Sequence, residues 1–377
     1  MKIYAYNLLE GEDLHLRHDM VVQVTDGKIV SVESGSKKDC DHVLGETMTL
    51  MPALVDGHTH LALDARLPGH LGMTDDSEAK QTIRALNSLN SNLEAGITTL
   101  RSLGDRYYID VLLRDMGSSG QLISPRLSVA GIGMKSSHGH GYVGKGFSGS
   151  EEFRRQSREN LYEGVDWLKI FVTAGAPPVG DLVPSFLSRE EIRTVVEEAH
   201  SVGKKVAAHC IGGKALKLCC QEGVDVLEHC YWVDEEDIEA IREYKTTVCF
   251  TPGVFLDDSR LPMCPQKHVE RVKATRMQVK ERLAALVESS PSFIIGSDAY
   301  HGLLYRDVEY MVSLNMSRLE ALKGVTVYAG RLLDMKIGSI EKGFNSDLIA
   351  VEGDPLKDEG VLSSPSFILA GDKVIKK

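Results

Sequence analysis

Short apolar runs alternate with longer amphipathic runs through the middle of the chain. The apolar runs have the length of buried strands, and they begin near Leu54, Ile97, Leu127, Trp167, Val206, Val224, Thr247 and Phe293. Between them lie stretches with apolar residues at helical spacing, such as residues 77–96, 188–203 and 268–289. These alternating strand–helix units predict an α/β fold, a (β/α)8 TIM barrel, which we place at residues 52–336.

The two ends of the chain have a different pattern, with short strands, turn signals and little helical spacing. Residues 1–51 contain the runs MKIYAYNLL and DMVVQVTDGKIVSVES, in which Asp26-Gly27 is a hairpin signal. Residues 337–377 have the same character in IGSIEKGFNSDLIAVEGDP and FILAGDKVIKK. We therefore expect a small β-sandwich domain, formed by residues 1–51 together with residues 337–377, beside the barrel.

Length and charge restrict the class of protein. A chain of 377 residues is long enough for one barrel of about 250 residues and a small second domain. Its 43 Lys+Arg and 54 Asp+Glu give a net charge of −11, which argues against a nucleic-acid partner. No apolar run approaches the roughly 20 residues that cross a bilayer, and the segment MKIYAYNLLEGED lacks the features of an export signal. We expect a cytoplasmic protein without a membrane partner, for which a homo-oligomer formed through the outer helices is one arrangement.

The cysteines fit a reducing compartment. There are seven, an odd number, and they are expected to be free thiols. Cys210 and Cys230 directly follow His209 and His229, which invites a metal-ligand interpretation. Neighbouring strand residues point to opposite faces, however, so these two cysteines are predicted to be small buried apolar side chains instead.

Potential metal ligands stand at the ends of the predicted strands. His58 and His60 are separated by one residue of an extended strand, so both rings project from the same face. The remaining candidates are Lys169, His209, His229 and Asp298. Because the C-terminal ends of the strands meet at one face of a barrel, this set predicts a metal-centred active site at that face.

Lys169 lies within WLKIFV, where the barrel should enclose the strand. An isolated buried ammonium group would lose several kcal/mol of hydration free energy. Two interpretations are open: a strand-end lysine paired with a carboxylate, or an amine that has reacted with CO2 to give an anionic carbamate able to bridge two cations. The histidines and Asp298 in register with Lys169 favour the carbamate.

Longer segments around these residues extend the pattern. They are MPALVDGHTH, AGITTLRSLGD, SHGHGY, DWLKIF, AAHCIGG, VLEHC, IIGSDA and GSIEKGFNSDLIAVEGDPL. Over nearly its whole length the chain resembles the amidohydrolase superfamily, with the binuclear pattern of HxH, carboxylated Lys, His, His and Asp. It is most similar to the imidazolonepropionase-like and prolidase-like branch, which includes metal-dependent dipeptidases and carboxypeptidases. The resemblance implies a metal-dependent hydrolase that acts on a carbon–nitrogen bond of a small molecule.

The same resemblance implies a role for each candidate ligand. Two divalent metal ions are expected per chain, and zinc is the first expectation for imidazole and carboxylate ligands. His58, His60 and Asp298 would hold the more buried ion, His209 and His229 the second, and carboxylated Lys169 would bridge both. The nucleophile would be a hydroxide between the metals, with Asp298 taking its proton and passing it to the leaving group.

Residues that contact the substrate are harder to predict. The resemblance implies that His140 touches the substrate and places His138 in the same loop, although either could be a loop-stabilising or surface histidine. Tyr231 follows His229 by two residues, and it could bind a carboxylate or oxyanion or be a core tyrosine. Arg101 could pair with a substrate carboxylate or form a structural ion pair at the barrel rim.

Several functions remain open on the sequence alone. The favoured one is cleavage of an amide bond in a dipeptide or N-acyl amino acid, and the same chemistry could act on a cyclic amide, lactone, ester or carbamate. A mononuclear deaminase is disfavoured by Lys169 and because Gly212, not Glu, stands three residues after His209. A binding scaffold is disfavoured by the complete ligand set.

Overall fold

Parallel strands form the central part of the chain in the computed structural model, which describes residues 1–141, 144–178, 180 and 182–376. Residue 377 of the predicted terminal domain therefore lies outside the described residues. The barrel strands are β6 (Leu54–Thr59), β7 (Ile97–Ser102), β8 (Arg126–Val129), β9 (Met134–Lys135), β10 (Trp167–Phe171), β11 (Lys205–Cys210), β12 (Val226–His229), β13 (Thr247–Phe250) and β14 (Phe293–Ile295). The third strand of the barrel is in two parts, since β8 pairs with β7 and β9 pairs with β10. The predicted (β/α)8 barrel is confirmed.

Two glycines bring the first and last barrel strands together. A Cβ atom on Gly296 would lie 2.4 Å from the backbone nitrogen of His58, and one on Gly57 would lie 2.7 Å from the carbonyl oxygen of Ile295. Just beyond this contact, the Asp298 amide donates to the His58 carbonyl at 2.9 Å. The absence of side chains at these two positions therefore lets β6 and β14 approach and brings two predicted ligands side by side.

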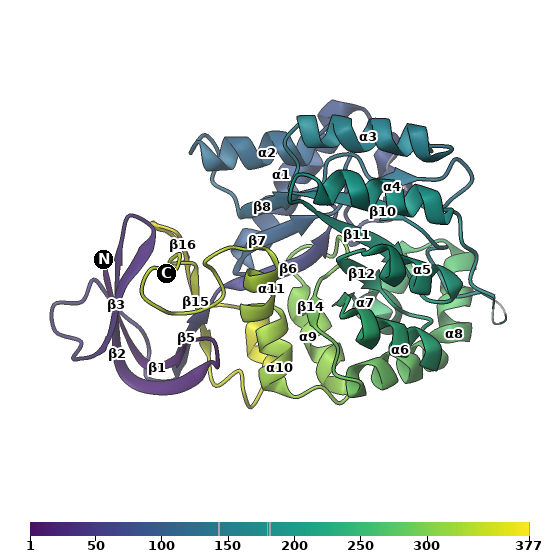
Figure 1. Ribbon diagram of the computed structural model, residues 1–377. Helices are drawn as coiled ribbons and strands as arrows, with labels where there is room; N and C mark the ends of the chain where they lie inside the picture. Colours follow the sequence, from purple (N-terminus) through teal and green to yellow (C-terminus); the bar gives the residue numbers. More distant parts are fainter. Residues whose placement is uncertain (142–143, 179, 181, 377) are drawn as a thin grey trace.

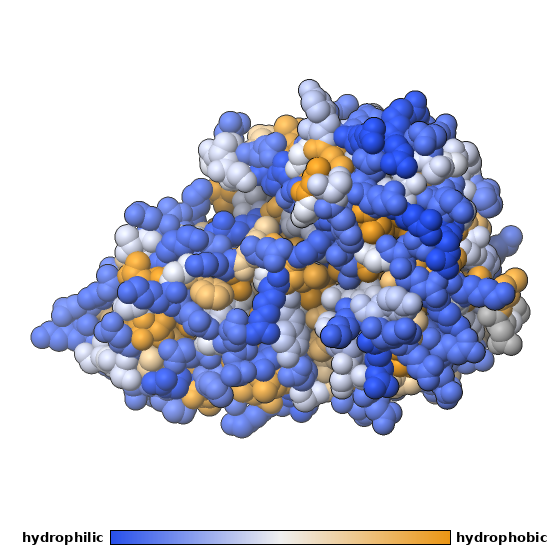
Figure 2. Space-filling view, viewed as in Figure 1, coloured by the Kyte–Doolittle hydropathy of each residue, from blue (hydrophilic) through white to orange (hydrophobic). Residues whose placement is uncertain are grey.

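Helices cover the outside of the barrel (Figure 1). They are α1 (Glu78–Glu94), α2 (Ile109–Ser118), α3 (Ser150–Tyr162), α4 (Arg189–His200), α5 (Lys214–Glu222), α6 (Glu235–Tyr244), α7 (Gly253–Leu256), α8 (Gln266–Glu288), α9 (Leu304–Ser313), α10 (Arg318–Gly324) and α11 (Val327–Leu332), with short 3-10 helices η1 (His70–Asp75), η2 (Asp258–Met263) and η3 (Glu359–Ser363). Local sequence sets their ends: α4 begins at a capping box between Ser188 and Glu191. The face shown in Figure 2 is largely hydrophilic, with apolar residues scattered over it. Within the described ranges, no helix combines the length and apolar character needed to cross a membrane.

The two ends of the chain share one sheet. Its strands are β1 (Lys2–Glu10), β2 (His15–Thr25), β3 (Lys28–Ser34), β4 (His42–Val43), β5 (Met48–Pro52), β15 (Leu348–Glu352), β16 (Phe367–Ala370) and β17 (Lys373–Lys376). The order is β17-β16-β15-β5-β1-β2-β3, so the antiparallel pair β5–β15 joins the two ends. Asp26 and Gly27, with φ of 49° and 68°, form the predicted hairpin turn. This is the expected β-rich domain (Figure 1), while its predicted residue limits remain a prediction.

Side chains alternate between the inside and outside of the barrel. On β10, Leu168 and Ile170 pack in the layer between strands and helices, whereas Trp167 belongs to an apolar cluster inside the barrel. Cys210 and Cys230 are buried in the outer layer, as predicted. All seven cysteines are free thiols. The lower interior is apolar, and the polar residues described next stand above it.

Candidate metal centre

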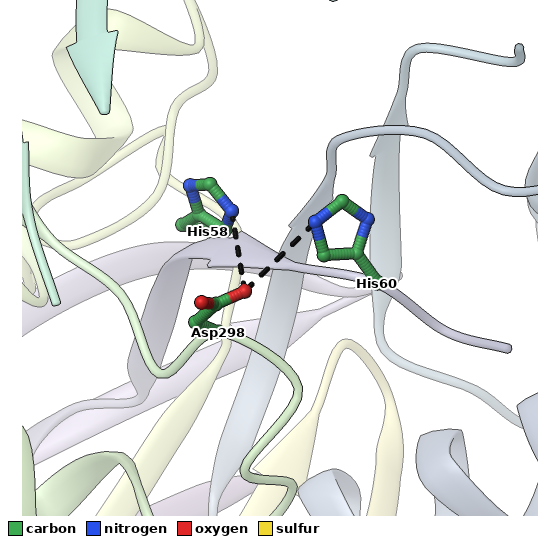
Figure 3. Close-up of side chains that lie close together, drawn as sticks. All are labelled: His58, His60 and Asp298. Carbon is green, nitrogen blue, oxygen red and sulfur yellow. Dashed lines mark ion pairs between the residues drawn. The ribbon is translucent and has the colours of Figure 1, made fainter. Parts of the chain in front are cut away.

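His58, His60 and Asp298 meet where β6 and β14 end (Figure 3). One carboxylate oxygen of Asp298, Oδ1, lies 3.5 Å from Nε2 of His58 and 3.8 Å from Nε2 of His60. One potential ligand atom from each residue lies within 4.8 Å of those from the other two. The carboxylate and both rings converge on one point, which is the arrangement of three ligands around a metal ion.

Two of the predicted ligands stand on left-handed backbone. His229 ends β12 with a φ of 82°, and Asp298 follows β14 with a φ of 52°. Such values are uncommon for residues other than glycine, and they concentrate at functional sites. At His229 the kink also breaks the alternation of the strand, so both Glu228 and His229 lie beside His58.

The second predicted group adjoins the first. The ring centroids of His209 and His229 are 4.6 Å apart, and those of His58 and His229 are 4.7 Å apart. His209 is held at the end of β11 and His229 at the end of β12. The four histidines therefore form one continuous cluster with Asp298 at the upper end of the barrel.

One ring nitrogen of each of these four histidines is hydrogen-bonded to a protein oxygen. The contacts are His58 Nδ1 with Glu228 Oε2 (2.6 Å), His60 Nδ1 with the Gly104 carbonyl (2.7 Å), His209 Nε2 with the Ala174 carbonyl (3.1 Å) and His229 Nδ1 with Thr251 Oγ1 (2.8 Å). An acceptor that holds one nitrogen fixes the ring and leaves the other nitrogen for a metal, as in metal-binding histidines generally.

Lys169 is completely buried among these residues. Its ammonium nitrogen has no hydrogen-bond partner in the described part of the chain, and it lies 5.1 Å from the centre of the Phe171 ring. Burial lowers the pKa of Lys169 to about 8, although Glu228 acts in the opposite direction. A buried amine with a lowered pKa and no partner is suited to reaction with CO2.

Burial also sets the charges of the other ligands. It lowers the pKa of His58, His209 and His229 well below the ordinary value, which leaves neutral imidazoles able to bind a metal. Burial alone would raise the pKa of Asp298, but His58, His60, Arg260 and Lys169 together hold it below its usual value. The site therefore combines neutral rings with an ionised carboxylate.

The unpaired buried atoms of these residues and their donor types fit a metal site. Nε2 of His58 and Nζ of Lys169 are both enclosed and without a hydrogen-bond partner among the described residues. Unpaired polar atoms in a buried position are costly unless something binds them. The donor types, imidazole and carboxylate, suit a divalent transition metal.

His140 and Tyr231 both line the cleft above the ligands. The ring of His140 lies 4.7 Å from that of His209, and it fits because Gly175 has no Cβ, which would lie 2.3 Å from its Cε1. Burial lowers the pKa of His140 to about 4. The Tyr231 hydroxyl lies 2.9 Å from the Thr251 carbonyl, to which it donates. Both are positioned to touch a substrate, and their roles stay predictions.

His138 and Arg101 lie elsewhere. His138 is hydrogen-bonded to Ser136 of its own loop at 2.8 Å and packs against Phe186 of the segment between β10 and α4, apart from the residues that line the cleft. Arg101 is fully buried inside the barrel, where it donates to Glu228 at 2.7 Å and to the Gly57 carbonyl at 2.6 Å. Arg101 therefore forms a structural ion pair with Glu228, and this pair lies inside the barrel instead of at its rim.

Sequence reasoning did not identify several residues of the site. Glu228 supports His58 from below, and Arg260 holds the Ser297 and Asp298 carbonyls at 3.2 and 2.9 Å. His70 and His268 line the cleft from η1 and α8. Glu228 could have been found as an acidic residue directly before the predicted ligand His229, whereas no local sequence pattern distinguishes Arg260, His70 and His268.

A (β/α)8 barrel with this cluster at the C-terminal ends of its strands has the architecture expected of a metal-dependent hydrolase. The amidohydrolase family matches residues 49–377, and the chain belongs to that family. The resemblance found in the sequence is thereby confirmed, and the protein is an enzyme that acts on carbon–nitrogen bonds of small molecules.

Individual relatives are distant but align over most of their length. Ochratoxinase of Aspergillus niger is 25% identical over 419 aligned residues, covering 99% of this chain and 86% of the relative. The structure of a Xaa-Pro dipeptidase with bound methionine in its active site matches with a TM-score of 0.87 at 24% identity, covering 100% of this chain and 99% of the other. A prolidase complexed with N-methylphosphonate-L-proline matches with a TM-score of 0.88 at 22% identity, covering 100% and 99%. At these identities the two structures show a shared fold.

Proposed function

We propose that the protein is a binuclear metal-dependent amidohydrolase that releases an amino acid by cleaving the amide bond of a dipeptide or an N-acyl amino acid. The observation that carries the proposal is the set of four histidines, each fixed through one ring nitrogen, around the unpaired amine of Lys169. The similar structures of a Xaa-Pro dipeptidase with bound methionine and of a prolidase complexed with N-methylphosphonate-L-proline support an amino-acid-derived substrate.

In this proposal two divalent metals, zinc in the first instance, are held by His58, His60 and Asp298 and by His209 and His229. Lys169, carboxylated by CO2, is shared between them. When bound, the metals supply a nucleophilic water at neutral pH and polarise the scissile carbonyl. The buried rings are neutral, so metal binding does not have to displace a proton from the nitrogen that each ring offers.

Asp298 and His140 are the proposed catalytic residues. The ionised carboxylate of Asp298 accepts the proton of the attacking water and passes it to the nitrogen of the leaving amino acid, since its side chain is 26% exposed toward the cleft. The neutral ring of His140, beside His209, hydrogen-bonds to the substrate carbonyl group. Tyr231 lines the same cleft and orients the substrate.

The test is a hydrolysis screen with zinc-loaded protein, pooled dipeptides and pooled N-acyl amino acids, in which free amino acid is detected. We expect release by the wild type, about two metals per chain by elemental analysis, and loss of both in Lys169→Ala. Labelled bicarbonate should enter the wild type but not that variant. Ammonia release with one metal per chain would instead identify a deaminase, and no release by fully loaded protein would contradict the proposal.

Cytoplasmic location and assembly into a homo-oligomer belong to the proposal as well. Free thiols at all seven cysteines agree with a reducing compartment. Fractionation of the native cells and light scattering of the purified enzyme test these two points separately from the chemistry.

A further inference from the structure

The cleft above the metal ligands is small and has a distinct charge. Its volume is about 290 Å³, at the lower end of the range for small-molecule sites. Apart from the ligands themselves, its ionisable lining includes two arginines and two further histidines, which are Arg260, Arg271, His70 and His268. Among the lining residues that the structure describes, Asp298 is the one carboxylate, and it is a predicted metal ligand. A positive cleft stands out on a chain whose net charge is −11.

Arg260 is the inner of the two arginines. It is 6% exposed, and its guanidinium group donates to the Ser297 and Asp298 carbonyls while lying 4.5 Å from the centre of the Tyr300 ring. Within the described ranges its hydrogen bonds go to carbonyl groups and no carboxylate lies at ion-pair distance. The nearby Asp307 does not serve as one, because burial raises its pKa to about 8 and keeps it protonated at neutral pH. Asp298, whose pKa Arg260 helps to lower, is the carboxylate that acts on this guanidinium group, and it is also a predicted metal ligand. A buried cation without a directly paired carboxylate is unfavourable, and an anionic ligand would relieve that cost.

Arg271, on α8, also lines the cleft, and its side chain is exposed. His268 and His70 line the same cleft. Burial and then Arg271 and Arg260 lower the pKa of His268, and burial and then Arg260 lower the pKa of His70. Both rings are therefore neutral hydrogen-bonding groups at neutral pH. Nδ1 of His70 is enclosed and has no hydrogen-bond partner in the described chain. Arg260 and Arg271 thus offer two permanent positive charges to a molecule bound in the cleft, and His70 offers an unused ring nitrogen.

The two arginines distinguish between the two substrate classes that the proposed function leaves open, which are dipeptides and N-acyl amino acids. A dipeptide carries an ammonium group, which requires a carboxylate or several carbonyl acceptors and is repelled by two arginines. An N-acyl amino acid lacks the ammonium group and keeps the carboxylate. Both carry the carboxylate that the arginines attract, and only the N-acyl amino acid lacks a positive charge that they repel.

We propose that the cleft selects N-acyl amino acids over free dipeptides, with Arg260 and Arg271 as the residues that set this preference. The inference rests on the proposed function. In the reaction, the oxygen of water bonds to the acyl carbon, the amide carbon–nitrogen bond breaks, and a proton from water passes to the nitrogen. The products are a carboxylate and a free amino acid, and no further co-reactant is needed.

The experiment compares pairs that share the same C-terminal residue, N-acetyl-L-Xaa and glycyl-L-Xaa, which are close in size and differ mainly by the ammonium group. With the zinc-loaded enzyme we expect kcat/KM to be at least tenfold higher for the N-acetyl member of each cleaved pair. Arg271→Gln should lower the ratio of kcat/KM for the N-acetyl member to kcat/KM for the glycyl member at least threefold in each cleaved pair. Lys273→Gln is the matched control, because it removes the same charge from an exposed position of α8 outside the cleft lining.

Binding to the metal-free protein, measured by titration calorimetry with N-acetyl-L-Xaa and glycyl-L-Xaa, distinguishes the two proposals. Hydrolysis of neither member of any pair by fully loaded enzyme would overturn the proposed function, while tighter binding of the N-acetyl compound, weakened in Arg271→Gln, would still support the charge preference. Hydrolysis or binding that is equal for both members, or better for the glycyl compound, would overturn the preference and leave the proposed function standing.

Discussion

At the scale of single residues, the metal centre rests on a buried ion pair. Glu228 bridges two partners, since one carboxylate oxygen contacts His58 at 2.6 Å and the other accepts from Arg101 at 2.7 Å. Arg101 in turn lies 4.8 Å from the centre of the Trp167 ring, at the top of the apolar interior. Glu228 is therefore a positioning residue, which acts on the metal through the orientation of His58.

Substitution of Glu228 by Gln should affect stability and metal affinity together. Removing one partner of a buried pair leaves Arg101 as an unpaired charge, and the free energy of unfolding should fall by about 3–5 kcal/mol. Metal affinity should fall roughly 10–100-fold because His58 loses its charged acceptor. Denaturant titration and competition with a chelator measure the two effects.

The double variant Arg101→Met, Glu228→Gln separates the two roles. Without the unpaired guanidinium group, the free energy of unfolding should recover in large part, while metal affinity stays low. Recovery of metal affinity in the double variant would show that Glu228 matters for folding alone.

Asp307 gives the molecule a defined pH dependence. It is fully buried on α9, accepts from the Gly253 amide at 2.8 Å, and has its pKa raised by burial from 3.8 to about 8. The folded protein thus holds this proton up to a higher pH than the unfolded chain. Stability from this residue is complete below about pH 4 and is lost as pH rises toward 8, by at most about 1.4 kcal/mol per pH unit.

The variant Asp307→Asn should remove that slope. We expect its free energy of unfolding to be close to that of the wild type near pH 4 and to exceed it increasingly toward pH 8, in denaturant titrations at several pH values. Parallel curves for the two proteins over this range would mean that Asp307 is ionised in the folded state.

At the scale of elements, the contact between β6 and β14 decides whether the ligands meet. Gly296 faces the His58 backbone so closely that Gly296→Ala would force the strands apart. We expect a loss of about 1–3 kcal/mol in the free energy of unfolding and reduced metal content, because His58 and Asp298 belong to the separated strands.

Gly72→Ala is the matched control, since a Cβ there would meet nothing within 4 Å. It should leave both metal content and unfolding unchanged. Equal behaviour of the two variants would contradict the role given to the strand contact.

Elements were predictable where local patterns determine them. Short continuous apolar runs predict the barrel strands because each strand must be buried on both faces, and the histidines were visible because they stand at strand ends. The sequence did not indicate Glu228, because regular alternation along the strand would point its side chain away from the site if His229 points into it. The left-handed backbone at His229 breaks that alternation. His70, Arg260 and His268 reach the cleft from η1, η2 and α8, through contacts between distant parts of the sequence that no local period records.

At the scale of the whole molecule, β15 links the β-rich domain to the barrel. Leu348 and Ala350 belong to the apolar cluster of the terminal sheet, whereas Ile349 and Val351 belong to the barrel core. Ile349 packs on Gly96, where an added Cβ would lie 2.8 Å from its Cγ2. Because its two faces are buried in different cores, β15 couples the β-rich domain to the barrel.

We expect the molecule to unfold in one calorimetric transition, and Ile349→Ala to lower its midpoint as a whole, with a loss of about 2–5 kcal/mol in the free energy of unfolding. Ile83→Ala, at a side chain that is 60% exposed, should change little. Two separate transitions, only one of them sensitive to Ile349→Ala, would show that the units are independent.

The shared sheet also has a consequence for how the protein is made. Thr49 on β5 donates to the carbonyl of Gly353, 304 residues further along the chain. Synthesis on the ribosome proceeds from the N-terminus, so β1 to β5 emerge long before β15 to β17 exist. One edge of β5 therefore stays unpaired until the barrel and β15 have been translated, so the terminal sheet can be completed only at the end of synthesis.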